Sequence, residues 1–91
     1  MRTFTPITTE SAIALNTGTA SNVGSSELVR LVNTHTAVVL VTLEEDGGTD
    51  IGTFTLASGE SAIIQKKATD KIFGGHAGVL ICGVRLSGMH L

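Results

Sequence analysis

The chain has 91 residues, a net charge of −2, one cysteine, and neither tryptophan nor tyrosine. A chain of this length forms one domain that buries only about 60–65% of its unfolded surface, so a disulfide, a metal or a partner subunit usually supplements its core. The single cysteine excludes an internal disulfide, and scattered basic residues without aromatic platforms argue against a nucleic-acid partner.

Short β-strands separated by turns are the structure that the composition predicts. Thr, Val, Leu, Ile and Gly dominate, and no stretch carries an apolar helical period. We expect strands over residues 2–7, 10–15, 26–33, 36–44, 51–57, 60–66, 70–73 and 77–86. The chain is therefore expected to be all-β, with residues 1–91 forming a single domain. The expected architecture is a small two-sheet antiparallel β-sandwich, Greek-key/jelly-roll or Ig-like, with about eight short strands.

The N-terminal segment, residues 1–9, allows two interpretations. Pro6 and the alternation of threonine with Phe4 and Ile7 suit the first strand of the sandwich. They equally suit an extended arm that adds a strand to a neighbour's exposed sheet edge. The segment lacks the basic and apolar regions of a signal peptide. The longest apolar run, residues 37–41, is too short to span a membrane, so we expect no membrane partner.

The connection at residues 16–26 is rich in turn-forming residues. It is long enough to cross from one sheet to another.

Two predicted strands are apolar on both faces, whereas antiparallel sheets normally keep one face polar for water. In residues 36–43, one face carries Val39 and Val41 and the other carries Val38 and Leu40. In residues 79–86, one face carries Leu80, Cys82, Val84 and Leu86, and the other begins with Val79 and Ile81. A two-layer sandwich has one interior, so the second face of each strand needs a cover.

The cover is either the chain's own N-terminal segment or another protein. The small core favours an oligomer or assembly interface, because a partner subunit adds the burial that a short chain lacks. The candidate interface residues are Phe4, Pro6, Ile7, Val38, Leu40, Val79, Ile81, Met89 and Leu91.

Side chains that could perform catalysis or bind metal form no recognisable motif. His35, His76 and His90 lack metal-ligand spacing. No serine lies in a G-x-S-x-G sequence, and Cys82 sits in an apolar run, as a buried small hydrophobe would. We therefore predict no enzymatic activity, no catalytic or metal-binding residue, no cofactor and no small-molecule substrate.

The most polar stretch is LEEDGGTDIGTF, residues 43–54. An EF-hand loop starting at Glu44 would need glycine where Thr49 stands and a glutamate near Thr55, so the match fails at its diagnostic positions. A looser calcium loop remains an alternative. The glycine-rich centre favours a hairpin turn whose acidic side chains are exposed and aid solubility.

Five segments carry a family resemblance. They are VRLVN (29–33), AVVLVT (37–42), IGTFTLASGESAIIQK (51–66), TDKI (69–72) and VLICGVRL (79–86). In this order they resemble small β-sandwich virion proteins of tailed bacteriophages, over about residues 26–86. The shared features are strand and turn registers, so no functional residue is carried over.

The resemblance implies a capsid decoration, or cement, protein that stabilises joints between major capsid subunits. Its expected partners are major capsid protein subunits and copies of itself. Its expected location is the capsid exterior of the virion, after synthesis in the host cytoplasm. A neck or tail component is the alternative, followed by a small ligand-binding β-sandwich module.

Overall fold

The computed structural model describes residues 3–86, which form two antiparallel β-sheets. The strands are β1 (Phe4–Pro6), β2 (Ser11–Ala12), β3 (Leu28–Asn33), β4 (Val39–Glu44), β5 (Asp50–Leu56), β6 (Ser61–Gln65), β7 (Lys71–Gly74) and β8 (Val79–Leu86). A short 3-10 helix, η1 (Thr17–Thr19), follows β2. The all-β class and the eight strands are confirmed; several strands are shorter than predicted, and none extends more than one residue beyond its predicted range.

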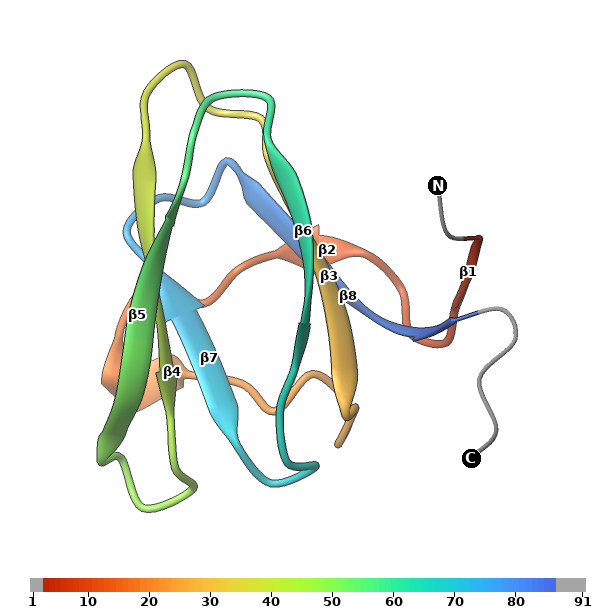
Figure 1. The fold of residues 1–91 in the computed structure, drawn as a ribbon. Coiled ribbons are helices and arrows are strands. Elements are labelled where there is room, and N and C mark those ends of the chain that lie inside the picture. The colour runs from red at the N-terminus through yellow and green to blue at the C-terminus, as the bar shows by residue number, and fades with distance from the viewer. Residues whose placement is uncertain (1–2, 87–91) are drawn as a thin grey trace.

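The strands divide between a first sheet ordered β1-β8-β3-β6, with β2 also paired to β8, and a second sheet ordered β5-β4-β7 (Figure 1). The chain changes sheet between β3 and β4, between β5 and β6, and at both ends of β7. As a result, β5 and β6 follow each other in sequence but lie at the edges of different sheets.

The core lies between the sheets and is built from aliphatic side chains. In β3, Val29 and Leu31 alternate inward, and Leu31 lies opposite Ile81 of β8. The second sheet contributes a matching set of buried side chains, Val39, Val41, Leu56 and Ile72. Each fully buried aliphatic side chain stabilises the fold by about 1.5–3 kcal/mol.

Val79 and Ile81 belong to this core, with Val79 fully buried and Ile81 5% exposed. The prediction that they lie on an outer, partner-binding face is therefore wrong. The strand is apolar on both faces as expected, but the pairing of β8 with β3 determines which face is inside. Leu31 and Ile81 are cross-strand neighbours and so share a face of the sheet.

The opposite face of β8, with Cys82, Val84 and Leu86, is also buried, and the N-terminal segment lies beside it. β1 pairs Phe4 with Leu86, and β2 pairs with β8 farther along the same edge. Between them, the Ile7 N–H donates to the Gly83 carbonyl at 2.8 Å. Residues 1–9 were predicted to form either the first strand of the sandwich or an arm that binds a neighbour. In the described residues 3–9, the segment forms the first strand of the chain's own sandwich.

The segment after β2 crosses between the sheets at residues 13 and 14, ahead of the turn-rich connection at residues 16–26 that the sequence showed to be long enough for a crossing. The Ile13 N–H donates to Val79 of the first sheet, and the Ala14 carbonyl accepts from Gly74 of the second. Ser21 then forms an isolated bridge with Ile72 of β7. This segment therefore links the two sheets along one side of the sandwich (Figure 1).

Asn33, at the end of β3, hydrogen-bonds the end of the first sheet to the backbone of the second. Its Nδ2 donates to the carbonyls of Ala37 and Leu56, both at 2.9 Å, and its Oδ1 accepts from the His35 N–H at 2.9 Å. The side chain is fully buried and satisfied, which offsets the desolvation of its amide.

Candidate partner-binding surfaces

The outer face of the second sheet exposes two large aliphatic side chains near the start of β4. Val38 is 63% exposed and Leu40 is 52% exposed, while Val39 between them is buried. The strand is therefore apolar on its inner and its outer face, as the alternation predicts. Leu40 lies opposite Thr55 of β5, so its immediate neighbour on this face is a short side chain that does not cover it.

β5 borders this apolar face as an open edge strand. It pairs with β4 along one side, and no described strand pairs with its other side. Natural edge strands are commonly protected by lysine, proline or a covering loop. Residues 51–56 contain neither lysine nor proline, and Ile51 is 52% exposed. The edge therefore presents backbone N–H and carbonyl groups to which another strand could add.

The N-terminal candidates form a separate group on the edge of the first sheet. Phe4 is half-buried, with the Arg30 guanidinium carbon 5.2 Å from its ring centroid. The Arg30 Nη1 also lies 3.3 Å from the Glu10 Oε2, so a salt bridge lies beside this edge. Pro6 and Ile7 are exposed, and a proline is tolerated here because an edge strand needs no N–H on its free side.

The nine candidate interface residues do not form one surface. Phe4, Pro6 and Ile7 lie on the first sheet's edge, Val38 and Leu40 lie on the second sheet's outer face, and Val79 and Ile81 lie in the core. Met89 and Leu91 lie outside the described residues. The sequence alone did not single out the open edge at β5, because strand order cannot be derived from alternation.

The acidic stretch forms the tip of the β4–β5 hairpin, as predicted. The Gly48 N–H donates to the Glu45 carbonyl at 2.8 Å, and Gly48 has a φ of 95°, which glycine adopts without strain. Glu45, Asp46 and Asp50 are exposed. The Asp46 Oδ1 forms a salt bridge with the Lys71 Nζ at 3.4 Å.

Glu44 departs from the prediction that the acidic side chains are exposed, because it is only 1% exposed. Its Oε2 accepts from the Thr17 hydroxyl at 2.8 Å, and its Oε1 has no described partner. The connection through η1 brings Thr17 to this position, which the local sequence around Glu44 does not reveal. In residues 3–86, no group of three or more His, Cys, Asp or Glu side chains could hold a metal ion.

His35 and His76 meet at the opposite end of the sandwich. Their rings are stacked with centroids 3.6 Å apart and planes 12° apart, and the His76 Nδ1 accepts from the Gly78 N–H. Parallel stacking directs the ring nitrogens away from a shared point, so the pair is unsuited to chelating one metal ion. Instead it joins the β3–β4 and β7–β8 connections.

Cys82 is buried, as predicted. Burial raises the pKa of its thiol, the Glu10 charge raises it further, and Arg30 opposes the rise. A thiol in this environment is protonated and a poor nucleophile.

Comparisons with known proteins do not place the chain in a family: no family model matches it, and no curated protein or solved structure is significantly similar to it. Among the described residues, no helix has the length and apolar character needed to cross a membrane.

Proposed function

We propose that the protein is a non-enzymatic virion structural protein of a tailed bacteriophage, which decorates the capsid and stabilises joints between major capsid subunits. The observation that carries the proposal is the apolar outer face at Val38 and Leu40, next to the open edge of β5. The resemblance of residues 26–86 to small virion proteins supports the same role. A neck or tail position is the alternative within the particle.

The contact would combine two kinds of interaction. A capsid segment in extended conformation adds to β5 and satisfies its free backbone groups. Val38 and Leu40 then lose their remaining exposure against that partner, with a gain of about 25 cal/mol for each Å² of apolar surface removed from water. Many copies, each bridging neighbouring subunits, would oppose the outward pressure of packaged DNA.

The direct test is quantitative mass spectrometry of purified virions. We expect a copy number comparable to that of the major capsid protein. A few copies per particle would move the protein to the neck or tail, and its absence from particles would overturn the virion role altogether.

A further inference from the structure

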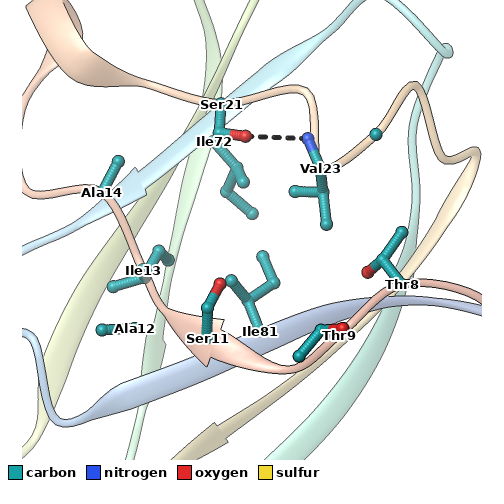
Figure 2. A pocket seen from close by; sticks show the side chains of 11 residues that line it. Thr8, Thr9, Ser11, Ala12, Ile13, Ala14, Ser21, Val23, Ile72 and Ile81 are labelled. Carbon is teal, nitrogen blue, oxygen red and sulfur yellow. Dashed lines mark hydrogen bonds between the residues drawn. The ribbon is translucent and has the colours of Figure 1, made fainter.

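A pocket of about 240 Å³ opens on the side of the sandwich where the chain crosses between the sheets. One wall is the segment 8–14, which includes β2, and the other is the connection at residues 21–24. Ile81 reaches the pocket from the first sheet and Ile72 from the second, so core side chains form the floor of the pocket (Figure 2).

The lining combines an aliphatic interior with neutral polar groups. The side chains of Val23, Ile72 and Ile81 point into the pocket, and the Ser11 hydroxyl oxygen turns toward it from the opposite wall (Figure 2). Thr8, Thr9 and Ser21 add further hydroxyls, and no charged residue lines the pocket. An ionised ligand group would therefore be desolvated without a counter-charge.

The wall at residues 23–25 is held in an unusual backbone conformation. Val23, Gly24 and Ser25 have φ values of 57°, 65° and 60°. A β-branched residue such as Val23 rarely adopts positive φ, and such strain persists only where surrounding contacts enforce it. Here the Val23 N–H donates to the Ser21 hydroxyl at 3.0 Å, and the Val23 carbonyl accepts from the Ser26 hydroxyl at 2.6 Å. These bonds fix Val23 over the pocket, so the wall is pre-formed.

The backbone beside the pocket is open to a further strand. Ser11 and Ala12 pair with Ile81 and Leu80 of β8, and the Ile13 N–H bonds to Val79. In an antiparallel ladder, hydrogen-bonded residues alternate with residues whose N–H and carbonyl point away from the partner strand. Ala12 holds this second position, so its backbone groups face the exposed side of β2.

We propose that this pocket binds one branched aliphatic side chain, leucine or isoleucine, from an extended and uncharged peptide segment of a partner protein. The side chain packs on the parts of Ile72 and Ile81 that line the pocket and against Val23, while the peptide backbone meets Ala12 and the Ser11 hydroxyl. The volume favours a single side chain, because pockets for whole small-molecule ligands usually exceed about 300 Å³. The site is separate from the β5 edge and does not depend on the virion role.

The proposal is tested by NMR on the full chain carrying isotope-labelled isoleucine and valine methyl groups. N-acetyl-isoleucine N-methylamide is added as the probe in increasing concentration. We expect saturable shifts of the Ile72, Ile81 and Val23 methyl signals, with Ile51 and Ile63 as internal controls that do not move. The corresponding glycine and lysine derivatives should shift the pocket signals at least tenfold less at equal concentration.

Two variants locate the binding. Ser11→Leu places a bulky side chain at the exposed mouth, and we expect it to abolish the shifts, while the matched change Ser61→Leu on β6 leaves them intact. Val23→Gly keeps the backbone conformation but removes the wall, so binding should weaken at least fivefold while the fold is retained.

Four outcomes would overturn the proposal. The first is unchanged binding in both pocket variants, and the second is a shift at Ile51 and Ile63 as large as that of the pocket signals. The third is binding of isobutanol as tight as that of the isoleucine derivative, because equal affinity would indicate a small-molecule site. The fourth is concentration-dependent shifts of the pocket signals without any probe, which would identify a second copy of the chain as the occupant.

Discussion

β4 and β8 are both apolar on two faces, but β8 buries apolar side chains on both faces whereas the outer face of β4 is exposed at Leu40. β8 lies inside the first sheet, with β3 on one side and β1 and β2 along its other edge, and Cys82, Val84 and Leu86 on its second face are buried. β4 lies inside the second sheet, but its outer face exposes Leu40, and its neighbour β5 is an open edge.

A strand that is apolar on both faces does not by itself mark an interface. The N-terminal segment borders β8, whereas no described segment covers Leu40. The described residues therefore leave the outer face of the second sheet uncovered at Leu40, whereas the region near β8 is part of the chain's own fold.

We expect the greatest loss of stability for Asn33→Ala, because the Asn33 side chain joins the end of β3 to Leu56 of β5 in the other sheet. The three hydrogen bonds of the Asn33 side chain would be lost, leaving the buried Leu56 carbonyl and the part-buried backbone groups of Ala37 and His35 without this partner. We expect the free energy of unfolding to fall by about 3 kcal/mol, measured by chemical denaturation. Asn16→Ala removes an exposed cap of η1 and should cost about 1 kcal/mol or less. Equal losses in the two variants would contradict the role given to Asn33.

The next prediction compares the covered strand β8 with the open edge strand β5. A Cβ on Gly83 of β8 would collide with the Ser26 side chain, whereas a Cβ on Gly52 of β5 would meet no atom within 4 Å. We expect Gly83→Ala to destabilise the fold by about 1–3 kcal/mol. Gly52→Ala should change the stability by no more than about 0.5 kcal/mol. Thermal unfolding of the two variants measures the difference, and the reverse order would show that the covered and the open strand have been assigned incorrectly.

A third prediction concerns binding rather than stability. Leu40→Ser should leave the free energy of unfolding within about 0.5 kcal/mol of the original chain, because the side chain is half exposed. It should weaken co-sedimentation with capsids that lack the protein by about tenfold, since the apolar contact is lost. Ile63→Ser, on the edge strand β6 of the first sheet, is the matched control and should bind normally. If Ile63→Ser alone reduced binding, the first sheet would be the partner surface.

The smallest expected effect is a pH dependence at the end of β6. Burial lowers the pKa of Lys66 from its ordinary 10.5, and the charges of Asp70 and Glu27 oppose the shift. Between the folded and unfolded pKa values the unfolded chain binds more protons, so stability should rise with pH as 10.5 is approached from below. Lys66→Met should remove this slope in denaturation measured at a series of pH values. The exposed Lys67→Met is the control, and a slope that survives in Lys66→Met would assign it to another group.

Much of the fold could be predicted from residue patterns. Alternation along residues 36–43 correctly divided Val39 and Val41 from Val38 and Leu40. The same alternation in residues 79–86 separated the two faces of the strand but not the inner from the outer one, because both faces are apolar. The glycine-rich hairpin at residues 45–49 was also predictable, since its turn chemistry is local.

Other features depend on segments far apart in the chain. Glu44 is buried because Thr17 reaches it from 27 positions away. The stacking of His35 on His76 and the pocket between β2 and the 21–24 connection likewise join distant segments. None of these leaves a pattern in a short stretch of sequence.

By itself, then, the sequence determined the all-β class, the approximate strand ranges and the presence of two strands that are apolar on both faces. These follow from backbone propensity and a period of two, which act between near neighbours. Only the tertiary structure decided which face of β8 is inside, that β5 is an open edge, and that the N-terminal segment lies along β8. Those choices depend on which strands pair and in which register, and pairing is set by contacts between distant residues.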